Sequence, residues 1–276
     1  MVGSVKMAVL GAGTIGSLII RSSVSMGFQV IGTGRSERTL ERVRSVGAEP
    51  TSDNLKAVKC AELVVISVKP QHFSDLIRQI PSELWKGKTV VSVMAGVRIE
   101  TLAKVIKDAN LFRAMPNVNA RVNMSTTALT GGEEGRDVVD TLFKNLGTNY
   151  WVTEDLMDVW TALIGSGPAF VSEIVDGLVL GAVASGMPRE IAYSAVLDML
   201  RGTAENLRHH KGHPIEVRDN VTTPAGTTIR GLKVIEERGV KAALIETIES
   251  STRRASELGK VIDEKIRKEI TEDHGS

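Results

Sequence analysis

The segment DNVTTPAGTTIRGL, residues 219–232, combines a proline–glycine turn with groups that can hold an anion. An amphipathic helix is predicted to begin directly after the turn. Because the first N–H groups of a helix have no partner inside it, those of Gly226, Thr227 and Thr228 can donate to a carboxylate. Thr228 adds a hydroxyl. The residues alone leave two interpretations open: a substrate carboxylate site, or a plain helix start capped by one of the preceding threonines.

A second candidate site is the glycine-rich segment GAGTIG near the N-terminus, which has the spacing G-x-G-x-x-G. It follows the apolar segment MAVL, a predicted strand, and opens the predicted helix SLIIRSSVSM. In that context the glycines allow a tight turn and a close approach of the backbone to a pyrophosphate at the helix N-terminus. The predicted cofactor-binding residues here are Gly11, Gly13, Thr14, Ile15 and Gly16.

The residues after the second predicted strand, FQVIGT, favour NADP over NAD. NAD-binding proteins commonly place a carboxylate here for the ribose 2′-hydroxyl, and a carboxylate would repel a 2′-phosphate. Arg35 and Ser36 can bind that phosphate instead. We therefore expect NADPH as the cofactor, with NADH as the second candidate. The alternative is that Arg35 is solvated and Ser36 caps the next helix.

Two more predicted strands run into short turns that could contact the same cofactor. LVVISV leads into Lys69-Pro70, and TVVSVM leads into Ala95-Gly96-Val97. Open α/β sheets bind ligands at the carboxyl ends of their strands, so these turns are predicted to form walls for the ribose and the nicotinamide. Ordinary strand-to-helix turns are the alternative, and spacing does not separate the two.

The elements that must position these sites indicate an α/β fold. β-branched segments alternate with amphipathic ones from residue 5 to about 152, which predicts βαβ units and a Rossmann-type, mainly parallel sheet. From Glu154 onward the pattern is helical throughout. We therefore predict a dinucleotide-binding domain over residues 1–153 and an all-helical substrate-binding and dimerisation domain over residues 154–276. The strand candidates are VKMAVL, FQVIGT, ELVVISV, KTVVSVM, NLFRAM, STTALT and TNYWVT.

The predicted helix from Pro168 to Ser185 is apolar on nearly every side and must be covered all round. A helical domain this small has few residues of its own to cover that helix. We therefore expect a second subunit to cover it, in a homodimer. The apolar segment carries Glu173 and Asp176 and is judged too short to span a bilayer, and we expect no membrane partner.

Composition narrows the function further. The 34 lysines and arginines nearly balance the 33 aspartates and glutamates, so no bulk charge favours nucleic acid or an anionic membrane. A single cysteine, Cys60, favours a reducing, cytoplasmic setting. No metal site is predicted.

The helical half offers poor candidates for the acid or base that a ketone reductase or alcohol dehydrogenase needs beside the reacting oxygen. His209, His210 and His213 lie in one polar run that is typical of a solvated helix end. An imine removes this difficulty, because its nitrogen is basic enough to arrive protonated and its carbon then accepts hydride directly. The protein need only orient the partners and hold a hydroxyl near the nitrogen.

The chain resembles the pyrroline-5-carboxylate reductase family from Met7 to about Lys260. The motifs are GAGTIG, SVKP, MAGV, FRAMPN, GSGPAF and above all DNVTTPAGTTIRGL. The resemblance implies NAD(P)H-dependent reduction of L-1-pyrroline-5-carboxylate to L-proline, the last step of proline biosynthesis. It also implies dimers that interlock through the helical domain and sometimes assemble into decamers.

The resemblance assigns roles residue by residue. It implies that Gly226 and Thr227 hold the substrate carboxylate and that Thr228 places its hydroxyl at the ring nitrogen. The sequence departs from the family pattern at Ala225, which stands where glycine is common, and at Phe170, which replaces a tyrosine. Further positions that match the family's cofactor contacts are Asn54, Ser67, Val68, Lys69, Pro70, Ala95, Gly96 and Val97.

Three alternatives remain at this stage. A β-hydroxyacid dehydrogenase relative would need a lysine after the domain boundary, and the sequence has none between Tyr150 and Lys211. A dinucleotide-sensing module would have no need of the Thr228 loop. A reductase of the six-membered cyclic imine is poorly separated, because one methylene gives only about 1–3 kcal/mol of discrimination.

Overall fold

The computed structural model describes residues 5–210 and 212–273, which form two compact units. The sheet unit contains the chain up to Ser166 together with the residues from Ser251 onward, and the helical unit is Gly167–Ser250. This division differs from the predicted boundary at residue 153, which followed the change from alternating strands to helices alone. Two segments make the difference: residues 154–166 belong to the sheet unit, and so does the C-terminal part of the last helix.

The sheet unit is built on one eight-stranded sheet with the order β3-β2-β1-β4-β5-β6-β7-β8. Neighbouring strands are parallel except for β6 and β7, so the predicted Rossmann-type, mainly parallel sheet is confirmed. Every strand candidate forms a strand. The strand that the sequence did not indicate is β3, a three-residue edge strand with a central proline. The strands are β1 (Lys6–Leu10), β2 (Gln29–Thr33), β3 (Glu49–Thr51), β4 (Leu63–Ile66), β5 (Thr89–Ser92), β6 (Asn110–Met115), β7 (Ser125–Gly131) and β8 (Gly147–Trp151).

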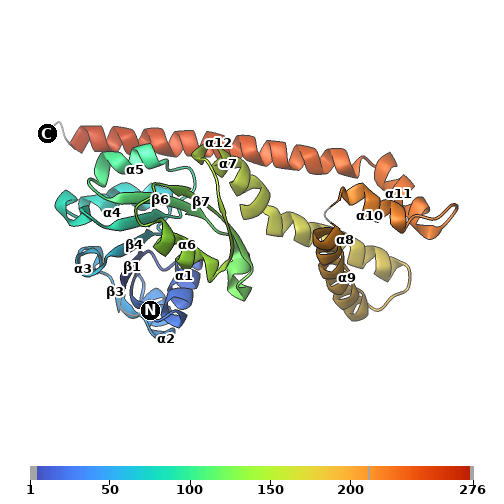
Figure 1. The fold of residues 1–276 in the computed structure, drawn as a ribbon, viewed down its shortest axis with the longest axis horizontal. Coiled ribbons are helices and arrows are strands. Elements are labelled where there is room, and N and C mark those ends of the chain that lie inside the picture. The colour runs from blue at the N-terminus through green and yellow to red at the C-terminus, as the bar shows by residue number, and fades with distance from the viewer. Residues whose placement is uncertain (1–4, 211, 274–276) are drawn as a thin grey trace. The chain divides into compact units, whose positions relative to one another are not determined.

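Helices cover both faces of this sheet (Figure 1). Successive residues of β1 alternate between two buried apolar clusters, with Met7 and Val9 in one and Ala8 and Leu10 in the other. The helices of the sheet unit before its last segment are α1 (Thr14–Ser25), α2 (Glu37–Ser45), α3 (Asn54–Cys60), α4 (Phe73–Arg78), α5 (Ile99–Val105), α6 (Arg136–Lys144) and α7 (Met157–Trp160). Shorter turns are η1 (Pro70–His72), η2 (Ser82–Trp85), η3 (Val118–Val122), η4 (Glu154–Leu156) and the π-helical η5 (Thr161–Gly165).

The helical unit contains helices and turns in its described residues, as the sequence predicted. Its helices are α8 (Gly167–Ala184), α9 (Arg189–His210), α10 (Pro214–Asn220), α11 (Thr227–Glu237) and the start of α12 (Val240–Asp273). The buried apolar cluster of this unit is small and consists of Val175, Val179 and Ala192. The 34-residue helix α12 continues beyond Ser250 into the sheet unit, where Ile266 joins a buried cluster.

Helix α8 leaves large apolar side chains in contact with solvent, including Val171, Ile174, Leu178 and Leu180. The helical stretch Glu154–Ala184 has 31 residues and a hydropathy of 1.5 over its most apolar window, of which 11% is buried. By length and composition it could cross a membrane, so the expectation that this segment is too short was wrong. The reason is that the helix begins well before the apolar run. The exposed apolar side chains of α8 must be buried against another apolar surface.

Candidate active site

The glycine turn after β1 is tight and leaves its backbone accessible. Gly11 has φ = +98° and donates its N–H to Thr33 Oγ1 at 3.0 Å. A Cβ on Gly16 would lie 2.1 Å from the Gly11 carbonyl oxygen, so α1 can approach β1 this closely only with glycine there. Gly13 is the N-cap of α1, with no side chain capping it, and a Cβ on Gly13 would meet open space. This is the geometry that a phosphate at a helix N-terminus requires.

A cleft of about 490 Å³ lies beside this turn. Several predicted cofactor residues line it together, namely Gly11, Gly13, Arg35, Asn54, Ser67, Val68 and Lys69. The sequence did not indicate the other lining residues, which are Thr33, Gly34, Ser52, His72, Asp75, Leu76 and Gln79. Of the remaining predicted residues, Thr14, Ile15 and Gly16 lie in α1, Ser36 precedes α2, and Pro70 begins η1.

Sheet register explains why turns from distant parts of the sequence meet at this cleft. Leu10 of β1 pairs with Ile66 of β4, and Ile66 pairs in turn with Ser92 of β5. The segments that begin with Gly11, with Ser67 and after Ser92 therefore leave the sheet at one edge, the carboxyl edge, where such folds bind ligands. Ala95 and Gly96 belong to the last of these segments but do not line the cleft; Gly96 lines a separate pocket of about 40 Å³ with Glu154 and Gly259.

The structure of the Arg35–Ser36 segment is consistent with both interpretations. The Ser36 hydroxyl accepts a hydrogen bond from Thr39 N at 3.3 Å and lies 2.9 Å from Thr39 Oγ1, so Ser36 caps α2. Arg35 is exposed and forms no ion pair with the residues that the structure describes. An exposed guanidinium at the mouth of the cleft suits a phosphate.

Asn54, the first residue of α3, lies on another wall of the cleft. Its amide Nδ2 donates to Gln79 Oε1 at 2.8 Å. The preceding Asp53 caps α3 by accepting from Lys56 N at 2.9 Å. The cap fixes the start of the helix, and the bond to Gln79 fixes the orientation of the amide.

In the helical unit, the start of α11 lacks a side-chain cap. Gly226 is the N-cap residue, and its φ and ψ are −72° and 176°. The interpretation that a preceding threonine caps this helix was wrong: Thr222 donates its hydroxyl to the Arg218 carbonyl at 2.7 Å, and the carbonyl of Thr223 accepts from Gly226 N at 3.1 Å. The loop is thus closed by its own bonds, one of which uses the Gly226 N–H. The N–H groups of Thr227 and Thr228, the first two residues of α11, stay open to a ligand.

The two threonines that begin α11 differ in exposure. Thr227 is exposed and Thr228 is half-buried. The Thr228 hydroxyl has no hydrogen-bond partner within the described part of the chain. Both the N–H groups and this hydroxyl can therefore bind a small anion that carries a hydrogen-bonding group.

Ala225 takes the backbone conformation that favours glycine. Its φ is +58°, which is uncommon for a residue with a Cβ. At the next residue a Cβ would have another effect, because it would lie 2.3 Å from Thr223 Oγ1 and force that side chain to move. The departure from glycine at position 225 therefore strains the loop.

Two family models match the chain. The model described as "Pyrroline-5-carboxylate reductase dimerisation" matches residues 154–258, and the one described as "NADP oxidoreductase coenzyme F420-dependent" matches residues 6–96.

Relatives match over almost their whole length. Pyrroline-5-carboxylate reductase of Thermus thermophilus is 34% identical over 264 residues, covering 92% of this chain and 98% of the relative. That of Methanosarcina acetivorans is 32% identical with the same shares covered. The crystal structure of 1-pyrroline-5-carboxylate reductase from Streptococcus pyogenes superposes with a TM-score of 0.85 at 28% identity, covering 92% of this chain and 99% of that one. A Plasmodium falciparum pyrroline carboxylate reductase with NADP bound, at 21% identity and a TM-score of 0.83, shares the fold; the match covers 92% of this chain and 98% of that one.

Proposed function

The chain belongs to the pyrroline-5-carboxylate reductase family, and from this premise we propose that it reduces L-1-pyrroline-5-carboxylate to L-proline, the final step of proline biosynthesis. It is an NAD(P)H-dependent oxidoreductase that acts on a CH–NH group. The observation that carries the proposal is the 34% identity with the Thermus thermophilus enzyme over 98% of that enzyme, a match that takes in most of both halves of the chain.

The residues around the cleft fit a dinucleotide. Gly11 and Gly13 let the backbone approach a pyrophosphate, and the uncapped start of α1 can donate to it. We assign Arg35 and Ser36 to the 2′-phosphate, with the Ser36 side chain also capping α2. We assign Asn54, Ser67, Val68, Lys69 and Pro70 to the adenosine and ribose side, and Ala95 and Gly96 to the nicotinamide side. NADPH, when bound, supplies the hydride; NADH is the second candidate donor.

The start of α11 fits the substrate. We assign Gly226 and Thr227 to the substrate carboxylate. The Thr227 N–H can give it a charge-assisted hydrogen bond worth roughly 1.5–3 kcal/mol, whereas the Gly226 N–H already donates to the Thr223 carbonyl. We assign the Thr228 hydroxyl to the ring nitrogen. Because the imine arrives protonated, these residues need only bind and orient it, which agrees with the lack of lysine between Tyr150 and Lys211.

The chain oligomerises through its dimerisation region and acts on a small molecule. We propose that the oligomer is a homodimer formed through residues 154–258, in which the partner subunit covers the exposed apolar side chains of α8, and that dimers can assemble further into decamers. A partner subunit packed on α8 would bury these apolar side chains, so no membrane is needed to explain them. We further propose that the protein is cytoplasmic and binds no nucleic acid.

The proposal is tested by product analysis. NADPH that carries deuterium at its transferable hydrogen is incubated with the protein and pyrroline-5-carboxylate, and the proline formed is resolved by chiral chromatography and mass spectrometry. We expect L-proline with the deuterium at the former imine carbon. Proline without the label, or no proline while NADPH is bound, would contradict the proposal.

A further inference from the structure

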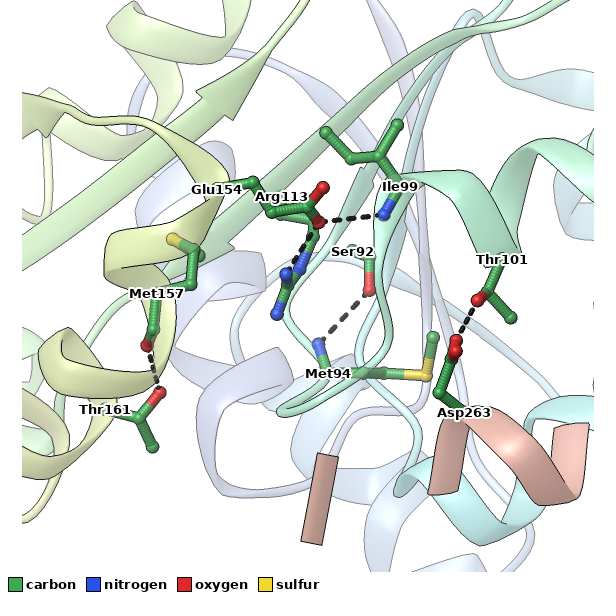
Figure 2. A network of polar contacts seen from close by, with 9 residues as sticks. All are labelled: Ser92, Met94, Ile99, Thr101, Arg113, Glu154, Met157, Thr161 and Asp263. Atoms are coloured by element: carbon green, nitrogen blue, oxygen red, sulfur yellow. Dashed lines mark hydrogen bonds and ion pairs between the residues drawn. The ribbon is translucent and has the colours of Figure 1, made fainter. Parts of the chain in front are cut away.

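Side chains from elsewhere in the sheet unit fix both ends of the turn that follows β5, residues Met94–Ile99, called here the β5 turn (Figure 2). At its start, Ser92 Oγ accepts a hydrogen bond from Met94 N at 3.3 Å. At its end, Glu154 Oε1 accepts one from Ile99 N at 2.9 Å. Val97 between them is fully buried. The turn is therefore held in one conformation by contacts that lie outside it.

Glu154 also joins this turn to the neighbouring strand. The same oxygen, Oε1, accepts from Arg113 Nη1 at 2.7 Å. Arg113 is 3% exposed and lies on β6, paired in register with Ser92. A buried guanidinium needs a counter-charge, so the ion pair keeps the Glu154 carboxylate in place. One carboxylate oxygen thus links the end of the β5 turn to the strand beside its start (Figure 2).

Helix α12 supports the turn from another side. Gly96 has φ = +76°, and a Cβ on it would lie 2.5 Å from the Cα of Gly259. Directly after the turn, the Thr101 hydroxyl donates to the carboxylate of Asp263, which is buried on α12. The backbone of the turn therefore rests against the backbone of α12.

We propose that Glu154 is a positioning residue for the nicotinamide end of the cofactor, acting through the β5 turn. This rests on the proposed function, in which Ala95 and Gly96 of that turn contact the cofactor. The residues assigned to the adenosine end, Arg35 and Asn54, follow other strands and make no contact with Glu154 within the described chain. Loss of Glu154 should consequently affect one end of the cofactor and spare the other.

The experiment compares two ligands on Glu154→Ala, Glu154→Gln and the control Asp155→Ala, which changes the exposed acid next in the chain. Calorimetry gives the dissociation constants of NADPH and of adenosine 2′,5′-bisphosphate, which represents only the adenosine end. For Glu154→Ala we expect about 10-fold weaker NADPH binding and unchanged binding of the fragment. Glu154→Gln keeps an acceptor for Ile99 N and should lie in between. Asp155→Ala should match the wild type.

A second variant tests the same turn without leaving Arg113 unpaired. A Cβ on Gly259 would lie 3.2 Å from Gly96 Cα, so Gly259→Ala pushes on the turn directly. It should weaken NADPH binding and spare the fragment, whereas Gly132→Ala, where a Cβ meets nothing within 4 Å, should change neither. If Glu154→Ala does not fold, Glu154→Gln carries the test of Glu154 and Gly259→Ala carries the test of the turn through which it acts.

Equal losses for both ligands, or no loss for either, would overturn the role of Glu154. Wild-type protein that binds NADPH but reduces no imine would refute the proposed function, while the ratio of the two dissociation constants still decides on Glu154. A wild-type protein that binds no NADPH would overturn both.

Discussion

At the scale of the residue, the site relies on groups without partners of their own. The Thr228 hydroxyl and the N–H groups of Thr227 and Thr228 have no partner among the described residues, so a ligand can use them without breaking existing bonds. Arg35 at the cleft mouth is likewise not paired with a described acid.

Thr228→Ala should lower kcat about 100-fold, the loss typical when one well-placed donor to the reacting group is removed. The dissociation constant of NADPH should stay unchanged, because Thr228 is assigned to the substrate. Steady-state rates and calorimetry measure the two quantities. The control is Thr222→Ala, whose hydroxyl is occupied by the Arg218 carbonyl. Near-normal turnover by Thr228→Ala would refute the hydroxyl's role.

Arg35→Ala should weaken NADPH binding by about 1.5–3 kcal/mol, roughly 10- to 150-fold, and NADH binding much less, because only NADPH carries the 2′-phosphate. Fluorescence titration of both dinucleotides measures the ratio. Arg44→Ala, an exposed arginine on α2 whose ion pair is with Glu37, is the matched control. Equal losses for NADPH and NADH would remove Arg35 from the phosphate site.

The sequence indicated these residues where a local motif marks them. GAGTIG and the Arg35–Ser36 segment each follow a strand directly, so their placement at the carboxyl edge could be predicted. Thr33 and Gln79 could not, because they reach the cleft through the register of β2 and the packing of α4, which leave no local signal. The resemblance to a family supplied the role of Thr228, which the residues alone left open.

At the scale of the element, the loop before α11 is strained by its one departure from glycine. A residue with a Cβ in the left-handed region costs about 1–2 kcal/mol, and Ala225 has φ = +58°. The sequence raised this question but could not settle it, because φ depends on how the loop closes on Thr223. Strand prediction failed at β3 for a similar reason, since a three-residue edge strand shows no alternation.

Ala225→Gly should raise the free energy of unfolding by about 0.5–1 kcal/mol, the relief of strain less the greater backbone entropy of unfolded glycine. Thermal unfolding at fixed protein concentration measures it. Ala204→Gly, at an exposed position within α9, should have the opposite sign and lower stability by about 1 kcal/mol. Destabilisation by Ala225→Gly would show that the loop is not strained there.

At the scale of the whole molecule, the helical unit buries few apolar side chains of its own. The cluster of Val175, Val179 and Ala192 contrasts with the apolar surface of α8, and the dimerisation model covers this region. The apolar sequence of α8 predicted that a second subunit covers this helix. The point where α12 passes from one compact unit to the other was not predictable, because the sequence has no glycine or proline between Val240 and Leu258 to mark it.

Leu178→Lys should weaken self-association by about 2 kcal/mol or more, roughly 30-fold, because it places a charge among the apolar side chains that we propose a partner subunit covers. Sedimentation velocity over a range of concentrations measures this. Val261→Lys, at an exposed apolar position outside residues 154–258, is the control. An unchanged association constant for Leu178→Lys would exclude the outer face of α8 from the interface.

The most direct test of the central claim is the initial rate of NADPH oxidation with three substrates offered in parallel: pyrroline-5-carboxylate, its six-membered homologue and a β-keto acid. We predict selective turnover of the five-membered imine. Preference for the six-membered ring would assign another cyclic imino acid, turnover of the keto acid would indicate a hydroxyacid dehydrogenase, and NADPH binding without any turnover would contradict catalysis altogether.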